Sequence, residues 1–226
     1  MAIALSRRSF LAGAAGLLAA TRALAGEKAG GVAMSDKLDL DRFIDDVRRA
    51  NRETEAQRAV DEVLTRTLSD PARLITALGE PRVAGLNALY RSPDLTILHV
   101  IWAPLMILLP HNHNMWASIG IYTGREDNIL WERSASSAAA GHGGVEAVRA
   151  ASLSEKEVFP LPKDAIHSVT NPIPRMTGAI HVYGGDFFAP TGRSEWDPET
   201  LRERPWDIEA VRKRFREASE RFEAEQ

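Results

Sequence analysis

A series of short apolar segments, separated by turn-forming residues, fills the middle of this sequence and constrains the fold more than any other feature. The segments cover residues 86–90, 95–103, 105–109, 115–122, 129–132, 145–150, 157–161, 165–169 and 178–183. Many short strands at this spacing are typical of an all-β sandwich or barrel. A parallel α/β sheet would need intervening helices, which this stretch lacks. The pattern therefore predicts a mainly-β domain over residues 84–190.

Apolar residues recur at helical spacing on both sides of this stretch. Residues 38–83 carry two such patterns, followed by a third short helix that begins near Pro71 and ends near Gly79. Proline suits the first turn of a helix and glycine its end. Residues 191–226 form a C-terminal extension with a charged helix over residues 209–222, whose apolar stripe is Val211, Phe215 and Phe222. The sequence thus predicts short α-helices before the β domain and one helix after it.

The first 25 residues have the order of features of an export signal. Arg7 and Arg8 precede an apolar run over residues 11–20, and residues 23–25 form an Ala-Leu-Ala cleavage pattern. The paired arginines make this segment resemble a twin-arginine signal. This resemblance implies recognition by the twin-arginine export machinery and a periplasmic or otherwise exported protein. An uncleaved anchor is the alternative, although a membrane span needs ~20 apolar residues. Residues 26–37 are predicted to be a linker.

Composition narrows the chemistry that a site in this chain can use. The sequence has no cysteine, which excludes disulfides, thiolate metal sites, iron–sulfur clusters and a cysteine nucleophile. The formal net charge of −3 offers no basic surface for nucleic acid. Any metal must therefore be held by His, Asp or Glu, and the chain has only 6 histidines.

Three of these histidines have the spacing of a metal site. Side chains alternate between the two faces of a strand, so His111 and His113 lie on one face. A third imidazole, from His167 on a facing strand, would complete a three-nitrogen site with open positions for substrate or dioxygen. Imidazole suits Fe, Ni, Cu and Zn. In contrast, His99 falls within a strongly apolar segment and is predicted to be structural, and His142 falls in a glycine-rich loop and is predicted to be exposed.

The residues around these histidines resemble the two metal-binding motifs of the cupin superfamily, whose fold is the double-stranded β-helix, or jelly roll. The first motif, G-x5-H-x-H-x3-4-E-x6-G, matches at His111, His113 and the closing Gly124, with Leu105 at the first glycine and no glutamate at the carboxylate position. The second, P-x-G-x2-H-x3-N, matches at Pro162, His167 and Asn171, with Asp164 in place of glycine. The resemblance covers residues 84–190 and implies a jelly roll.

The absence of the ligand glutamate makes the chain resemble the three-His thiol dioxygenases, the cysteine dioxygenase-like group of cupins. That group has an S-x-H-x-Y sequence beside its iron, and this chain has His181 and Tyr183 with Ala179 in place of the serine. The resemblance implies catalytic roles for His181 and Tyr183 and a supporting role near the metal for Asn171. It also implies a substrate-carboxylate arginine upstream of the first histidine, for which Arg91 is the candidate. The cysteine that some members cross-link to the tyrosine is replaced, at or near Ser118.

The function that this resemblance implies is that of a non-haem Fe(II) dioxygenase, which oxidises a small thiol to a sulfinate with O2. Another divalent metal is the alternative cofactor, because three imidazoles accept several ions. Two other functions remain open. One is a metal-dependent cupin enzyme of a different reaction type, such as an isomerase, a lyase or a non-thiol oxygenase. The other is a module that binds metal or ligand without catalysis.

Overall fold

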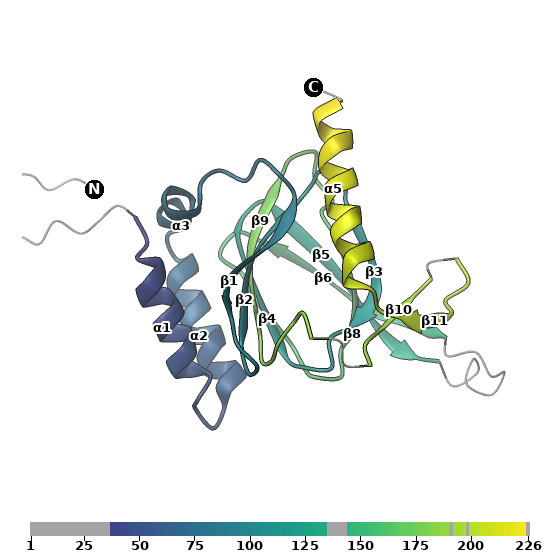
Figure 1. The fold of residues 1–226 in the computed structure, drawn as a ribbon, viewed down its shortest axis with the longest axis horizontal. Helices are drawn as coiled ribbons and strands as arrows, with labels where there is room; N and C mark the ends of the chain where they lie inside the picture. Colours follow the sequence, from purple (N-terminus) through teal and green to yellow (C-terminus); the bar gives the residue numbers. More distant parts are fainter. Residues whose placement is uncertain (1–36, 135–143, 190–191, 198, 225–226) are drawn as a thin grey trace, which may run out of the picture. The chain divides into compact units, whose positions relative to one another are not determined.

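The computed structural model describes residues 37–134, 144–189, 192–197 and 199–224, which belong to one unit of the chain, residues 35–226. The predicted export signal, the linker up to residue 36 and His142 lie outside the described residues. Figure 1 shows the N-terminal helices packed on one side of a β structure and a further helix near the C-terminus. The predicted order of short helices, β domain and C-terminal helix is confirmed.

The N-terminal helices are α1 (Leu40–Ala50), α2 (Ala56–Leu68) and α3 (Pro71–Leu78). Asp39 caps α1, because its side chain accepts a hydrogen bond of 3.0 Å from the backbone N–H of Arg42. Pro71 stands in the first turn of α3, where its missing N–H costs no hydrogen bond. Each helix buries apolar residues on one side. The three helices therefore form a layer whose apolar face packs against a sheet.

The β domain consists of two antiparallel sheets in the described part of the chain. The strands are β1 (Gly85–Arg91), β2 (Thr96–Trp102), β3 (Ile107–Asn112), β4 (Ala117–Thr123), β5 (Arg125–Arg133), β6 (Val145–Ser154), β7 (Val158–Leu161), β8 (Ile166–Thr170), β9 (Thr177–Tyr183), β10 (Ser194–Trp196) and β11 (Glu203–Pro205). One sheet has the order β1-β2-β9-β4-β7 and the other has the order β11-β10-β3-β8-β5-β6. From β2 to β5 and from β7 to β10, successive strands alternate between the sheets. This alternation is the winding of a double-stranded β-helix, so the predicted jelly roll is confirmed.

The three central strands of the first of these sheets are buried on both faces. Every residue of β2, β4 and β9 is buried. Residues on the outer face, including Ile97, Ile180 and Val182, pack with the apolar stripes of the N-terminal helices. Residues on the inner face, including Leu98 and Ala179, pack toward the other sheet. Burial on both faces explains why these strands stand out as continuous apolar runs in the sequence.

Helix α5 (Ile208–Ala224) packs against the edge of the domain near β1 and contributes Val211, Phe215 and Ala218 to the inner core. The backbone N–H of Ala84 donates a hydrogen bond of 2.7 Å to Ser219 Oγ on the same helix. Strand β10, beyond the predicted domain boundary at residue 190, joins the sheet beside β3. The β structure therefore extends into the C-terminal extension. None of the described helices is long and apolar enough to cross a membrane.

Two turn positions correspond to the glycines of the motif that the sequence resembles. Gly124 has φ of 90°, and an added Cβ would meet Thr177 Oγ1 at 2.2 Å, so only glycine fits there. Leu105, which replaces the first glycine of the motif, also lies in the left-handed region with φ of 56°. Both positions at which the motif has glycine thus have a left-handed backbone in this chain.

Candidate metal centre

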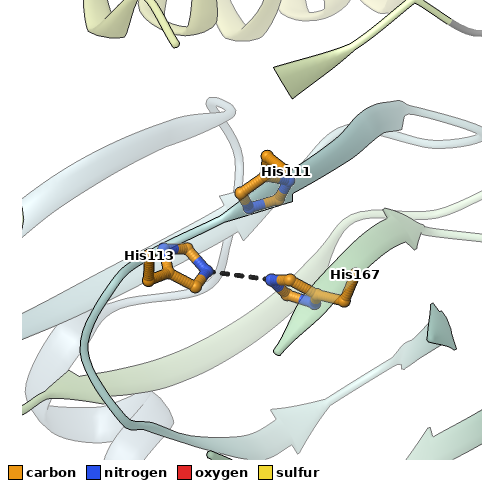
Figure 2. Close-up of side chains that lie close together, drawn as sticks. All are labelled: His111, His113 and His167. Carbon is orange, nitrogen blue, oxygen red and sulfur yellow. Dashed lines mark hydrogen bonds between the residues drawn. The ribbon is translucent and has the colours of Figure 1, made fainter. Parts of the chain in front are cut away.

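The three predicted ligands, His111, His113 and His167, come together in the interior of the domain (Figure 2). His111 stands on β3 directly opposite His167 on β8, and His113 follows β3 by one residue. Their ring centroids are 4.5 to 5.1 Å apart. One nitrogen from each ring lies within 4.8 Å of the others, and all three side chains are buried. The antiparallel register of β3 and β8 therefore brings together ligands that are more than 50 residues apart in the sequence.

Hydrogen bonds fix the orientation of two of the rings. His111 Nδ1 lies 2.7 Å from the backbone oxygen of Leu109, and His167 Nδ1 lies 2.7 Å from Oδ1 of Asn128. Both partners are acceptors, so each Nδ1 carries the proton and each Nε2 keeps a lone pair. A partner on the second ring nitrogen is the usual way in which proteins orient a metal-binding histidine.

The cluster meets the chemical requirements of a divalent ion. Burial lowers the pKa of His111 to about 4 and lowers those of His113 and His167 well below their usual value, so all three rings are neutral near pH 7. Nε2 of His113 lies only 2.9 Å from Nε2 of His167. Two nitrogens that share one ion at ~2.0–2.1 Å each lie at most about 4.2 Å apart. The distance between these two nitrogens is within that limit, and the ligand nitrogen of His111 lies within 4.8 Å of the other two.

His181 and Tyr183 lie beside the three histidines, as the resemblance implied. Both stand on the inner face of β9, and the ring of Tyr183 lies 5.0 Å from that of His113. His181 Nδ1 is 3.1 Å from the Tyr183 hydroxyl. On the other side of the ring, His181 Nε2 lies 3.2 Å from Oε2 of Glu126, a fully buried carboxylate on β5. Glu126 thus contacts the nitrogen of His181 that faces away from Tyr183.

Glu126 also connects this pair to a metal ligand. Its Oε2 accepts a hydrogen bond of 2.8 Å from Trp102 Nε1, and its Oε1 accepts one of 3.0 Å from Asn128 Nδ2. The Oδ1 of Asn128 in turn accepts from His167. An indole N–H can only donate, so Oε2 accepts from Trp102. A continuous buried network therefore runs from His167 to Tyr183.

Sequence analysis missed Glu126 and Asn128. Both residues stand on the first half of β5, before residue 129 where the predicted strand began. They are spaced two residues apart, so they lie on one face of the strand. That spacing, directly after the closing Gly124 of the motif, was the available signal. Arg125 and Asp127 alternate with them along the strand and form an ion pair of 2.8 Å with each other.

The candidate centre borders a small, mostly apolar cavity of about 20 Å³. This volume is room for about one water molecule, so an organic ligand must displace lining side chains. The five predicted site residues His111, His113, His167, His181 and Tyr183 line it, together with Leu86, Val100, Trp102, Leu108, Val169, Phe187, Trp206 and Val211. The aromatic residues Phe187 and Trp206 come from the segment after β9, which sequence analysis did not connect with the site.

Two other predicted residues lie away from this cavity. Arg91 has a side chain that is 51% exposed and forms a bidentate ion pair with Asp186, at 2.8 and 2.9 Å. Asn171 is fully buried at the end of β8, where its Nδ2 donates to the backbone oxygens of Ala103 and Arg175. The structure therefore does not bring Arg91 together with the histidines, and Asn171 holds backbone segments together.

The sequence matches no protein-family model and no curated protein. Several solved structures are similar in fold at low identity. A cupin family protein from Methanocaldococcus jannaschii is 12% identical with a TM-score of 0.39, over 48% of this chain and 86% of that one. A double-stranded β-helix protein from Klebsiella pneumoniae is 9% identical with a TM-score of 0.38, over 51% and 81%. Oxalate decarboxylase from Bacillus subtilis is 13% identical with a TM-score of 0.36, over 46% of this chain and only 24% of that enzyme.

Proposed function

We propose that this chain, a double-stranded β-helix protein with a three-His candidate metal site, is a non-haem iron(II) dioxygenase that oxidises a small thiol to a sulfinate. The observation that carries the proposal is the composition of the site. Three neutral imidazoles converge on one point, and no carboxylate belongs to the ligand cluster found among the described residues. Such a site leaves the full charge of a divalent ion uncompensated and favours anionic ligands.

His111, His113 and His167 would hold the iron through one ring nitrogen each. Bound there, iron(II) would lower the pKa of a coordinated thiol and activate dioxygen at the same centre. The net reaction is RS⁻ + O2 → RSO2⁻. Two S–O bonds form and the O–O bond breaks, while sulfur loses the four electrons that dioxygen gains. The reaction needs no further reductant, so the chain needs no second redox cofactor.

The protein residues around the site provide a path for the thiol proton. Glu126 accepts from His181 Nε2, so His181 Nδ1 is free to accept from the Tyr183 hydroxyl. Burial raises the pKa of Tyr183, so the phenol stays protonated. When the thiol ionises, its proton can pass to Tyr183 Oη while the phenol proton moves to His181 Nδ1. Glu126 then balances the charge of the imidazolium that forms, which makes it a positioning residue for the pair.

The test is oxygen uptake by the iron(II)-loaded full chain with a panel of small thiols, with sulfinate identified by mass spectrometry. We expect one O2 consumed per thiol and both oxygen atoms incorporated into the product. His113→Ala removes one of three ligands and should lower the metal content and reduce turnover by at least about 10³-fold. The control is His99→Gln, which changes a buried histidine that does not line the cavity.

The outcomes separate the alternatives. Tight iron binding without oxidation of any thiol would reject thiol oxidation and leave another metal-dependent reaction or a binding role. Equal metal content in wild type and His113→Ala would reject the metal centre itself.

A further inference from the structure

Arg193 is a buried cation whose hydrogen-bonding capacity is mostly unused. The residue is only 5% exposed, and one guanidinium nitrogen, Nη2, donates to the backbone oxygen of Phe187. Nε and Nη1 are buried and have no hydrogen-bond partner among the described residues. The guanidinium stacks over the ring of Trp206 at 3.8 Å, and Trp206 Nε1 is also buried without a partner there. Three donor nitrogens of this stacked pair thus have no acceptor among the described residues.

The neighbouring charges are already paired. Arg91 forms its bidentate pair with Asp186. Arg204 and Arg214 both contact Glu195, at 2.8 and 3.1 Å. No carboxylate is within ion-pair distance of Arg193 in the described part of the chain. The internal stretches outside it, residues 135–143, 190–191 and 198, contain neither Asp nor Glu.

Arg193 is charged and close to the candidate metal centre. Burial lowers its pKa to about 10, which still leaves it protonated near pH 7. Its guanidinium lies 5.1 Å from the ring of Phe187, and both Phe187 and Trp206 line the cavity of the three histidines. Its positive charge contributes to the lowered pKa of His111 and of His113. An unpaired charge inside a protein is costly, which favours a role in which a ligand supplies the missing anion.

We propose that Arg193, stacked on Trp206, binds the carboxylate of a small substrate whose other end reaches His111, His113 and His167. The guanidinium fork matches a carboxylate, and Trp206 Nε1 provides a further donor. A ligand with an anionic group at each end would balance both Arg193 and the divalent ion. The site therefore selects a short thiol that carries a carboxylate. The identity of the thiol end rests on the proposed function, whereas the carboxylate end rests on Arg193 alone.

The test compares mercaptoacetate with its neutral amide, mercaptoacetamide, which differ only in the charge at one end. Both probes are short, as the small cavity requires. Binding to the iron(II)-loaded full chain is measured by calorimetry under nitrogen, so that no turnover occurs. We expect wild type to bind mercaptoacetate about 10- to 100-fold more tightly than the amide, because the contact joins two opposite charges. Arg193→Met should reduce this ratio to about 1.

Two variants serve as comparisons. Arg133→Met is the matched control, because Arg133 also lies over a tryptophan ring, at 5.1 Å from that of Trp196, but is paired with Glu203 and does not line the cavity. Its ratio should equal that of wild type. Arg91→Met tests the arginine that the sequence pattern suggested, and it should also keep the wild-type ratio. Loss of the ratio in Arg91→Met with retention in Arg193→Met would overturn the proposal.

Further measurements distinguish a loss of carboxylate binding from a loss of folding or of thiol oxidation. Arg193→Gln, which keeps a polar side chain without the charge, provides a second variant if Arg193→Met does not fold. A wild-type ratio near 1 would overturn the proposal without any variant. Admitting oxygen afterwards tests the proposed function: an Arg193-dependent ratio without sulfinate rejects thiol oxidation only, and sulfinate with a ratio insensitive to Arg193 rejects the carboxylate site only.

Discussion

The two faces of the sheet β1-β2-β9-β4-β7 each bury one histidine hydrogen-bonded to one tyrosine. On the outer face, His99 Nε2 lies 2.8 Å from the Tyr122 hydroxyl, and the tyrosine ring crosses β9 at Gly178, where a Cβ would meet it at 2.2 Å. On the inner face, His181 Nδ1 lies 3.1 Å from the Tyr183 hydroxyl. The two pairs are similar in composition and burial.

The pairs differ in what lies beyond them. The outer pair lies beneath the helical layer, away from the cavity, and no carboxylate contacts His99 among the described residues. The inner pair continues through His181 Nε2 to Glu126 and borders the three metal-site histidines. A buried histidine paired with a tyrosine is therefore not evidence of a functional site. The third partner and an adjacent cavity make the difference.

Among substitutions in the two pairs and their partners, replacing Glu126 should have the largest effect on kcat. Glu126→Gln keeps the shape of the side chain but removes the charge that would balance a protonated His181. We expect kcat for thiol oxidation to fall by about 10²–10³-fold with KM changed by less than about threefold, because proton transfer is impaired and substrate binding is not. The pH profile of kcat should change as well.

His99→Gln is the comparison on the outer face, and its kcat and pH profile should match those of wild type. A Glu126→Gln enzyme with wild-type kcat would show that the carboxylate only fills space beside Trp102.

Removing each tyrosine hydroxyl gives a smaller effect that separates the two faces. Tyr183→Phe should lower kcat by about 10- to 100-fold, since the first proton acceptor of the path is lost. Tyr122→Phe should leave kcat unchanged and lower the free energy of unfolding by about 1 kcal/mol, the net value of one hydrogen bond. Steady-state kinetics and denaturant unfolding of both variants provide the measurements. Similar kinetics in the two variants would remove the distinction between the faces.

The last prediction concerns the loss of folding stability in acid that His99 causes. Burial lowers the pKa of His99 to about 4, whereas an unfolded histidine has a pKa near 6.5. The stability from the neutral ring is therefore present above pH 6.5 and is lost as the pH falls toward 4. Between pH 7 and pH 5, His99 should account for about 2 kcal/mol of the decline in unfolding free energy.

Denaturant unfolding of wild type and His99→Gln at both pH values measures this contribution, because the other buried histidines are the same in both proteins. Equal declines in the two proteins would show that His99 binds its proton equally well in the folded and unfolded states, which would contradict the prediction.

The architecture could be predicted because its signals are local. Apolar runs between turn residues marked most strands, and the helical spacing in residues 38–83 marked α1, α2 and α3. The alternation of side chains along a strand was enough to predict that His111 and His113 share a face. The same holds for His181 and Tyr183. The cupin-like spacing then added His167, whose position across from His111 depends on the register of β3 and β8.

The remainder of the site depends on contacts between distant segments. Glu126 is fully buried on β5, a strand whose place in the sheet depends on its pairing with β6 and β8. Arg91 matched the expected arginine in sequence, yet Asp186, 95 residues away, occupies both sides of its guanidinium fork. Arg193 and Trp206 belong to no recognisable motif, and only the packing of the segment after β9 places them beside the cavity.

The order of residues is enough to show which side chains share a face of a strand, where most strands end, and that any metal must be held without cysteine. Those properties follow from backbone geometry and residue chemistry within a few positions. Which buried charges have partners depends instead on the folded domain. An ion pair depends on distances between strands and loops that are remote in the chain, and those distances are set by the packing of the whole domain. For this reason Arg91 is paired with Asp186, whereas Arg193 has no carboxylate partner among the described residues.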